Sequence, residues 1–561
     1  MAELIPRIYS NFRGVDFRGE EINLVRSPDS LNVWKDYRKT ESIRTRPAMK
    51  KEVTFSNPVQ HIAIFNGAWL VQAWKTLYVN KTGNPSDWEN IYLRQLDDRR
   101  GNSFVFEDKW YYLDGEHFIV YDGTEAKDVE GYVPTTTIGR KPSGGGTPYE
   151  DVNMLSDYRI NSFLPDGVSK EYHLDAINID SDFSPVITHN GDVVSWAYTV
   201  NTEKGIVTFT DTIPEKPLTD GQDNLTIQFK KTVPGHKDRI LGCTLIQLFD
   251  NRVFFSGNEK YPNMVWHSSL NDPTYVSDLD YYREGMDLAK VKGMVAGNNA
   301  LWVFREPSET NTTVFYHVPT LDNTYGKIYP SSHSSISLGC VGKAINFNDD
   351  VVFFSDRGME GISGDITSEQ VVAHRSSLVD RKLLTESKYK DMILAEWEGY
   401  LLVIIGNKVY AADSRAVFQN VNHYEYEWFY WELEKEILCV HEENGTLYLG
   451  CDDGIYTLSD MSGDVESYWV TPKDKFNYPH KLKTTNKRGC VAEATGDISV
   501  YAKLEDTDFE LIGSHEGVTD YFVSRIKRKK FKDIQLKFYS PTRFSLESVT
   551  LESFVGGYIK R

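Results

Sequence analysis

Leu394-Ala-Glu-Trp-Glu-Gly-Tyr-Leu-Leu-Val403 is the stretch that decides the fold. It contains a short apolar segment, a polar turn with a glycine, and a second strand of apolar residues. This pattern is typical of a β-hairpin, because aromatic and β-branched residues favour strands and Asn, Asp, Glu or Gly between them favours a reversal of the chain.

The same pattern occurs in six other stretches, residues 63–71, 105–113, 248–255, 295–303, 345–354 and 439–449. If the second turn residue of each unit is its anchor, the spacings are 41, 143, 48, 51, 49 and 46 residues, for the anchors Gly67, Asp108, Asn251, Asn299, Asp350, Gly399 and Gly445. A period of roughly 40 to 50 residues with several strands per unit is typical of propeller blades. The sequence therefore predicts an all-β protein with a six- or seven-bladed β-propeller.

The spacing of 143 residues indicates an insertion of about 95 residues, once one typical period is subtracted. Pro142-Ser-Gly-Gly-Gly-Thr-Pro148 has the composition of a flexible linker, and short strand-like runs follow it. These runs, separated by Asn190-Gly191 and similar turns, fit a small inserted β-sandwich: 171–174, 185–188, 193–199, 205–210 and 225–229.

The two ends of the chain lack the blade period. The first residues are polar and are expected to form an arm or a strand that joins the ring, and strand-like runs after residue 460 indicate a C-terminal β-sandwich. The predicted domains are an N-terminal arm (1–58), a first propeller part (59–141), the inserted β-sandwich (142–235), a second propeller part (236–462) and the C-terminal β-sandwich (463–561).

Charge is distributed unevenly along the chain. The whole chain carries a net charge of −19, but residues 461–561 hold 17 Lys and Arg against 14 Asp and Glu, a net of +3, which leaves −22 for the first 460 residues. This balance argues against a general nucleic-acid binder, since affinity for phosphates comes from Lys and Arg that displace counterions. The acidic surface is expected outside the C-terminal domain.

The five cysteines, Cys243, Cys340, Cys439, Cys451 and Cys490, include no Cys-x-x-Cys pair, so we expect buried free thiols instead of disulfides or a zinc site. No apolar run approaches the roughly 20 residues that cross a bilayer, and the first residues lack the layout of a signal peptide. The sequence predicts a soluble, unsecreted product with no membrane-spanning segment.

One strongly basic segment is the candidate interaction site. Six cations fall within eight residues, Arg525, Lys527, Arg528, Lys529, Lys530 and Lys532. Such a cluster suits contact with DNA or with an acidic partner, and it also suits a solvated sheet edge that needs protection from self-pairing. The residues alone leave these readings open.

Other patterns predict no chemistry. Asn178-Ile-Asp-Ser-Asp182 alternates oxygen ligands but lacks the glycine and the later Glu of an EF-hand, so a turn is expected. Ser355-Asp-Arg-Gly358 and Phe304-Arg-Glu-Pro307 are faint single echoes of glycan-cleaving propellers. The carboxylate pairs 97–98, 349–350 and 452–453 fit turns. No histidine cluster, phosphate-binding Gly-rich loop or nucleophile elbow occurs, and we expect no catalytic residue, metal site or cofactor.

Short phrases along nearly the whole chain resemble the stabilization proteins of tailed bacteriophages. They include Asn11-Phe-Arg-Gly-Val-Asp-Phe17, Arg26-Ser-Pro-Asp-Ser-Leu-Asn-Val-Trp-Lys-Asp-Tyr37, Arg44-Thr-Arg-Pro47, Asn251-Arg-Val-Phe-Phe-Ser-Gly-Asn258, Trp266-His-Ser-Ser-Leu-Asn-Asp-Pro-Thr-Tyr275, Trp469-Val-Thr-Pro-Lys473, Lys483-Thr-Thr-Asn-Lys-Arg-Gly489, Phe531-Lys-Asp-Ile-Gln-Leu-Lys-Phe538 and Ser553-Phe-Val-Gly-Gly-Tyr-Ile-Lys-Arg561. The phrases are not a catalytic fingerprint and assign no role to single residues.

This resemblance implies a structural component of the virion neck or short tail, assembled in the host cytoplasm. Such a nozzle or hub protein forms a ring, commonly sixfold, below the portal and adaptor, and retains packaged DNA until it is ejected through the lumen. An acidic conduit agrees with that role because it repels phosphates. The alternatives are a receptor- or glycan-binding tail module and, less favoured, a glycan-degrading propeller enzyme.

Overall fold

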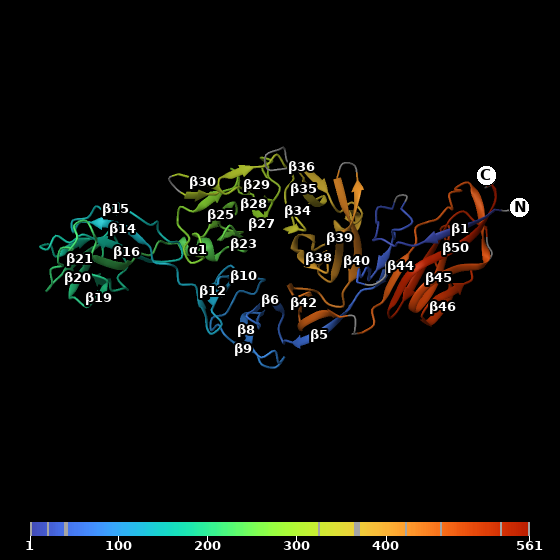
Figure 1. The fold of residues 1–561 in the computed structure, drawn as a ribbon, viewed down its shortest axis with the longest axis horizontal. Helices are drawn as coiled ribbons and strands as arrows, with labels where there is room; N and C mark the ends of the chain where they lie inside the picture. Colours follow the sequence, from blue (N-terminus) through green and yellow to red (C-terminus); the bar gives the residue numbers. More distant parts are fainter. Residues whose placement is uncertain are drawn as a thin grey trace. The chain divides into compact units, whose positions relative to one another are not determined.

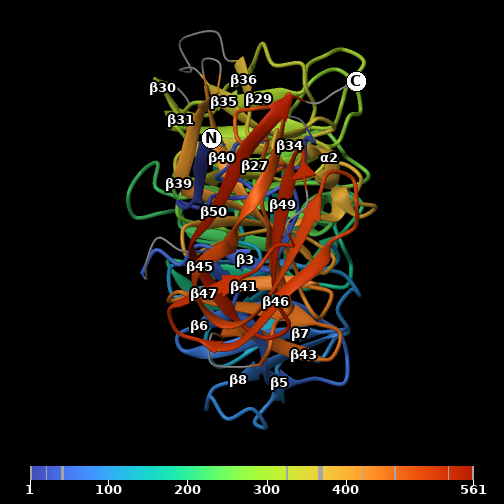
Figure 2. The same cartoon turned by 90° about the vertical axis from the view of Figure 1, so that its right-hand side faces the viewer.

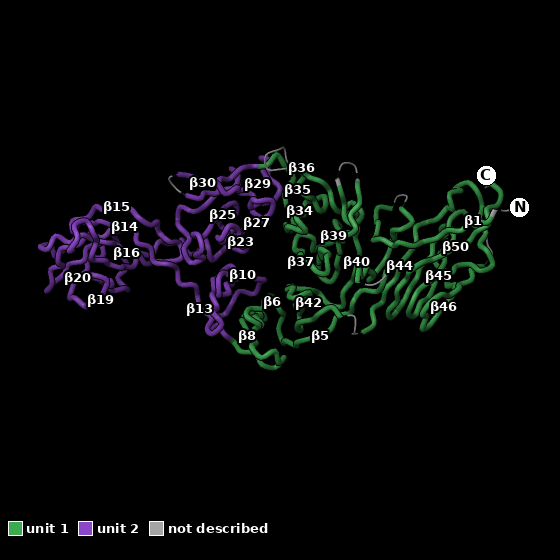
Figure 3. Tube along the Cα trace, in the orientation of Figure 1, with its two compact units in different colours: residues 1–90, 334–561 green, residues 91–333 purple. Residues whose placement is uncertain are grey.

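The computed structural model describes residues 3–19, 22–38, 43–323, 326–363, 371–420, 423–459, 463–527 and 530–558. The chain forms two compact units, residues 1–90 with 334–561 and residues 91–333 (Figure 3). Strands dominate both, and the helices among the described residues are the short α1 (His236–Leu241), α2 (Asp380–Leu383) and a 3-10 turn (Tyr389–Asp391). None of the described helices is long and apolar enough to cross a membrane. The all-β class predicted from the sequence is confirmed.

The first unit contains four antiparallel sheets that each have four strands (Figure 1). They are β6 (Val59–Phe65), β7 (Ala68–Ala73), β8 (Thr76–Asn80) and β9 (Glu89–Asn90); β33 (Ala344–Phe347), β34 (Asp350–Ser355), β35 (Gly358–Ser363) and β36 (Val371–His374); β37 (Ile393–Trp397), β38 (Tyr400–Ile405), β39 (Lys408–Asn420) and β40 (His423–Glu432); β41 (Cys439–Glu443), β42 (Thr446–Cys451), β43 (Gly454–Ser459) and β5 (Ala48–Thr54).

The second unit contains three sheets of the same kind. They are β10 (Asn102–Phe106), β11 (Lys109–Leu113), β12 (Phe118–Tyr121) and β13 (Ala126–Asp128); β23 (Leu245–Phe249), β24 (Arg252–Ser256), β25 (Met264–His267) and β26 (Tyr281–Arg283); β27 (Val291–Gly297), β28 (Ala300–Arg305), β29 (Val314–His317) and β32 (Ser331–His333). A small hairpin, β30 (Thr320–Asp322) with β31 (Gly326–Ile328), precedes the last strand.

The seven hairpins predicted from the sequence are confirmed, one at the start of each sheet. In six of them both central residues have positive φ, for example Asn66 at 50° and Gly67 at 78°. Turns of this type match the twist of the flanking strands, and Asn, Asp and Gly tolerate them best. The anchor Asp350 was wrong by one position, because Asn348 and Asp349 form that turn and Asp350 pairs with Phe347 as the first residue of β34.

The sheet β41-β42-β43 is completed by a strand from the other end of the sequence. β5 pairs antiparallel with β43 over its whole length, from Ala48 opposite Ser459 to Thr54 opposite Gly454. The chain then enters the neighbouring sheet at Val59, and β6 packs against β41 and β42. The two ends of the chain are thus joined by a ladder of backbone hydrogen bonds.

The insertion forms two sheets within the second unit. One contains β15 (Thr147–Pro148), β14 (Thr135–Arg140), β16 (Tyr158–Phe163), β22 (Leu225–Lys230), β18 (Val186–His189) and β19 (Asp192–Val194), and the other contains β17 (Glu171–His173), β21 (Ile206–Phe209) and β20 (Tyr198–Asn201). Both contribute to one buried cluster that includes Phe163, Tyr172 and Phe209. Residues 142–148, expected to be a linker, lie in the hairpin between β14 and β15, so the inserted sheets begin at Thr135.

The C-terminal residues and the N-terminal residues share a single 11-stranded sheet. Figure 2 shows β45, β49 and β50 side by side, as their pairing requires. The strands are β44 (Ser467–Val470), β45 (Lys481–Leu504), β46 (Glu510–Val518), β47 (Tyr521–Ser524), β48 (Lys530–Phe531), β49 (Ile534–Ser540) and β50 (Phe544–Tyr558), with β1 (Glu3–Tyr9), β2 (Ser30–Leu31), β3 (Val33–Trp34) and β4 (Ile43–Thr45).

This sheet differs from the separate N-terminal arm that the sequence suggested. β1 pairs with β50 over seven residues, and the buried Tyr9, Phe12 and Trp34 belong to the same hydrophobic cluster as Phe538. Burial of apolar surface is the main favourable term in folding, and aromatic side chains bury large areas, so these residues hold the N-terminal segment in the C-terminal sheet.

Candidate interaction surface and buried polar clusters

The basic segment lies between β47 and β49 of the C-terminal sheet. Arg525, Lys527, Lys530 and Lys532 are exposed, whereas Arg528 and Lys529 lie outside the described residues. Ile526 and Phe531 point inward and are 7% and 1% exposed, so the cations alternate with apolar anchors. This alternation explains why the segment stays on the sheet while its charges face solvent.

The backbone of the segment is fixed by a buried lysine. Lys483, on β45, is fully buried and its Nζ donates to the carbonyl oxygen of Lys532 at 2.6 Å. Burial lowers the pKa of Lys483. The sequence analysis identified the exposed cations but not Lys483, because a single lysine among polar residues gives no sign that it is buried.

A cavity of about 330 Å³ opens beside the basic segment. Leu504, Leu511 and Ile526 contribute apolar surface, and Glu505 and Glu510 line the same cavity as Arg525, Lys527 and Lys530. Charges of both signs around an apolar floor are typical of the rim of a protein interface, whereas a groove for nucleic acid is lined by cations alone. The lining of this cavity thus combines three cations with two carboxylates around an apolar floor.

A charged cluster in the first unit surrounds His374. Its Nδ1 lies 3.0 Å from Glu360 Oε1 on the paired strand, and its Nε2 lies 2.6 Å from Asp380 Oδ2 on α2. Burial acts to lower the pKa of His374, but the hydrogen bonds and charges of Asp380 and Glu360 outweigh it and raise that pKa to about 10. His374 is therefore charged at neutral pH and forms ion pairs with both carboxylates.

This cluster predicts a pH-dependent stability. The folded pKa is raised, so its contribution is fully present below the unfolded value of about 6.5 and is lost as the pH rises toward 10. We expect His374→Gln to lower the free energy of unfolding by roughly 3 kcal/mol near pH 6, and this gap to close by about pH 10. Urea unfolding of the wild-type chain and of His374→Gln between pH 6 and about pH 10 measures this difference. The exposed His480→Gln serves as the control, and a gap independent of pH would contradict the assignment.

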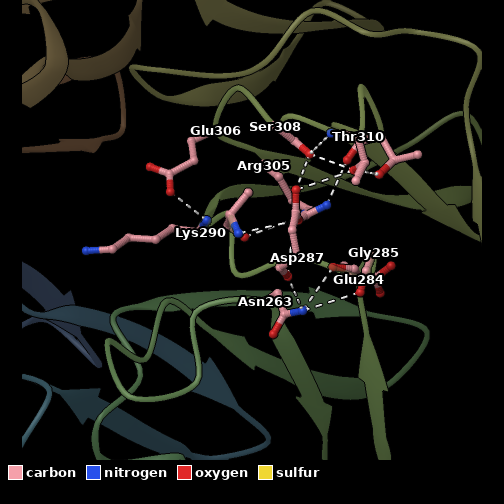
Figure 4. Close-up of polar contacts among 11 residues, drawn as sticks. Asn263, Glu284, Gly285, Asp287, Lys290, Arg305, Glu306, Ser308 and Thr310 are labelled. Atoms are coloured by element: carbon pink, nitrogen blue, oxygen red, sulfur yellow. Dashed lines mark hydrogen bonds and ion pairs between the residues drawn. The ribbon is translucent and has the colours of Figure 1, made fainter.

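Arg305 belongs to the segment whose sequence weakly resembles a motif of glycan-cleaving enzymes. In the structure its side chain is held by contacts within the protein (Figure 4). Its guanidinium is completely buried, forms an ion pair with Asp287, and donates to the carbonyl oxygens of Ala289 and Thr312 at 3.1 and 2.7 Å. Burial acts to raise the pKa of Asp287, but hydrogen bonds from Ser308 and Arg305 lower it to about 2. With its donors satisfied by the protein, Arg305 ties the β28–β29 loop to the chain before β27.

A second polar group in the same unit combines the exposed Ser331 with the buried Glu284 and His317. Glu284 lies between the other two, accepting from Ser331 Oγ at 2.7 Å and lying 2.9 Å from His317 Nε2. In a hydrolytic triad the histidine must lie between the nucleophile and the acid, so this order does not activate the serine. Glu284 and His317 are also completely closed to solvent.

The remaining candidates agree with the expected turns and thiols. Asp180 accepts from the backbone N–H of Thr232 at 3.0 Å, and Asp182 forms an ion pair with Lys230. Among the residues that the structure describes, no group of His, Cys, Asp and Glu side chains could hold a metal ion. All five cysteines are buried and free, as predicted. Of the carboxylate pairs, Asp350 is the exception: it forms a buried ion pair with Arg375, which the sequence did not indicate.

No protein-family model and no curated protein sequence matches the chain. Among solved structures it is similar to BamB from Moraxella catarrhalis, with 10% identity, a TM-score of 0.32 and coverage of 74% of this chain and 96% of that one. It is also similar to PorZ from Porphyromonas gingivalis, at 10% identity, a TM-score of 0.19 and coverage of 93% and 87%. An exo-β-1,3-galactanase from Phanerochaete chrysosporium matches at 8% identity, a TM-score of 0.19 and coverage of 80% and 95%. At these TM-scores the similarities assign neither fold nor function.

Proposed function

We propose that the seven four-stranded sheets are the blades of one seven-bladed propeller, and that the chain is a structural component of a tailed-bacteriophage neck. The observation that supports the propeller best is the pairing of β5 with β43, because a circular array needs one blade built from both ends of the chain. The two sheets of the insertion and the C-terminal sheet then act as attached modules.

The distribution of charge supports a ring of several copies. Residues 461–561 carry exposed cations and a net charge of +3, whereas the first 460 residues carry −22. A basic patch on one copy and an acidic surface on the next are complementary, which is what a head-to-tail contact in a closed ring requires. An acidic lumen would let packaged DNA slide out without sequence-specific contact.

In the virion such a ring, a hexamer by the family resemblance, would lie below the portal and adaptor, retain packaged DNA and form the conduit for its ejection. Native mass spectrometry of the purified chain, alone and with the portal and adaptor proteins, tests this assembly. A chain that stays monomeric in both conditions and is absent from washed virions would overturn the proposal.

The ring contact makes a prediction about the basic segment. We expect the fourfold replacement of Arg525, Lys527, Lys530 and Lys532 by Glu to dissociate the ring to monomers, because like charges would then face each other. High ionic strength should weaken the wild-type ring in the same direction, since salt screens surface charges. The matched control replaces four exposed lysines of the insertion by Glu: Lys141, Lys170, Lys204 and Lys216. Equal effects of the two sets would contradict a specific contact at the basic segment.

A further inference from the structure

A second cavity, of about 410 Å³, lies in the first unit between the sheet β41-β42-β43-β5 and the sheet β6–β9. Its size is within the range of roughly 300 to 1,000 Å³ found for small-molecule sites. Residues from β5, β7, β42, β43 and the loop before β9 line it. The cavity belongs to none of the polar clusters described above.

One wall of the cavity is aromatic. Trp69 and Tyr448 meet edge to face, with ring centroids 4.6 Å apart, and Trp88 lines the cavity from the loop before β9. All three rings are partly exposed. Among the described residues, neither the indole N–H of Trp69 nor the hydroxyl of Tyr448 has a hydrogen-bond partner. This wall therefore offers apolar ring surface together with an unused donor and an unused hydroxyl.

The polar part of the lining adjoins Tyr448 and carries a paired charge. Tyr448, Thr457 and Lys50 occupy successive paired positions across β42, β43 and β5. Glu52 is the extra residue of a bulge in β5, and a bulge commonly redirects a side chain. Glu52 Oε1 accepts from Lys50 Nζ and from Thr457 Oγ1, both at 2.9 Å.

The loop that carries Trp88 is held in place before any ligand binds. Asn80 Nδ2 donates to the carbonyl oxygen of Asn84 at 2.6 Å, and Asn80 Oδ1 accepts from the backbone N–H groups of Thr82 and Gly83 at 3.1 and 2.9 Å. The Trp88 indole donates to the carbonyl oxygen of Pro85 at 3.0 Å. A wall fixed in this way loses little conformational entropy on binding.

We propose that this cavity binds one neutral pyranose unit of a polysaccharide. A sugar ring has an apolar C–H face, which suits the aromatic wall, and a rim of hydroxyls that both donate and accept, which suits Lys50, Glu52 and Thr457. A phosphorylated ligand is disfavoured because Glu52 already neutralises Lys50. The inference does not depend on ring assembly, and its test reads out binding alone.

A glycan array that displays neutral, amino and acidic glycans, probed with the labelled full-length chain, identifies the ligand. We expect neutral glycans to bind, and the best of them to be confirmed by saturation-transfer NMR with the free oligosaccharide. Trp88→Ala and Glu52→Gln should each weaken that binding at least tenfold. Trp74→Ala is the matched control, because Trp74 is an exposed tryptophan of the β7–β8 turn that does not line the cavity.

A further substitution distinguishes a loss of binding from a loss of folding. Tyr448→Phe keeps the ring and removes only the hydroxyl, and we expect a loss of about threefold to tenfold with unchanged thermal unfolding. Absence of binding to every glycan on the array would overturn the proposal. Preferential binding of acidic or phosphorylated glycans, or binding that Trp74→Ala reduces as much as Trp88→Ala, would also overturn it.

Discussion

Replacing Arg375 by Met is expected to lower the free energy of unfolding by about 3 to 5 kcal/mol, because it leaves a buried carboxylate without its partner. Arg375 and Asp350 are 2% and 4% exposed, and the guanidinium donates two hydrogen bonds to the carboxylate at 2.9 and 3.3 Å. A third hydrogen bond reaches the carbonyl oxygen of Tyr424 at 2.9 Å. The pair therefore links the start of β34 and the residue after β36 to the start of β40.

The size of this effect comes from the unpaired charge and not from the strength of the ion pair. Adding Asp350→Leu to Arg375→Met should therefore recover about 2 kcal/mol, since an apolar pair of similar volume can replace a buried ion pair. Urea unfolding followed by tryptophan fluorescence measures this, and the Trp428 indole, which donates to the carbonyl oxygen of Arg375, reports on the site.

The control for this pair is Arg357→Met, an exposed arginine in the turn between β34 and β35. It should change the free energy of unfolding by no more than about 0.5 kcal/mol, as is usual for exposed sites. If Arg375→Met were as mild as Arg357→Met, the buried pair would not contribute as the geometry requires.

Local patterns predicted the hairpins well because a two-residue turn leaves a direct signature in the sequence. Asn66-Gly67 and Asn444-Gly445 adopt positive φ, and the residues that tolerate it cheaply are few. The error at Asp350 arose where Asn348, Asp349 and Asp350 are all turn-forming, so composition could not fix the register. The hydrogen bonds of Asp350 with Arg375 and Tyr426 explain why that residue lies in the strand.

Long-range pairing was the part that local patterns could not supply. β1 meets β50 across more than 500 residues of sequence, and its Glu3 and Arg7 give it a polar appearance. The inserted sheets begin at Thr135, seven residues before the predicted start at Pro142, because a Gly-rich run serves equally as a linker and as a hairpin loop. The exposure of the basic segment was predictable from its charge. The cavity with Trp69 and Tyr448 was not, because it exists only where two sheets meet.

The second large effect is expected for Gly454→Ala, at the point where β43 pairs with β5. Gly454 has φ +150°, a backbone conformation almost closed to other residues, and a Cβ there would lie 2.1 Å from the carbonyl oxygen of Val53. The substitution therefore has two effects: it strains the backbone of β43, and it displaces β5. We expect a loss of about 3 kcal/mol or more, combining strain with several lost backbone hydrogen bonds.

Gly445→Ala separates these two causes because Gly445 belongs to the same sheet and also has positive φ, at +80°, but no atom lies within 4 Å of its Cβ position. It should cost about 1 kcal/mol, the usual penalty for a left-handed residue. Hydrogen–deuterium exchange then shows where the loss falls. Faster exchange of residues 48–54 in Gly454→Ala and not in Gly445→Ala is expected, and the freed edge of β43 should promote self-association. Unchanged exchange of residues 48–54 in Gly454→Ala would mean that β5 does not depend on this glycine, and the pairing that joins the two ends of the chain would need another anchor.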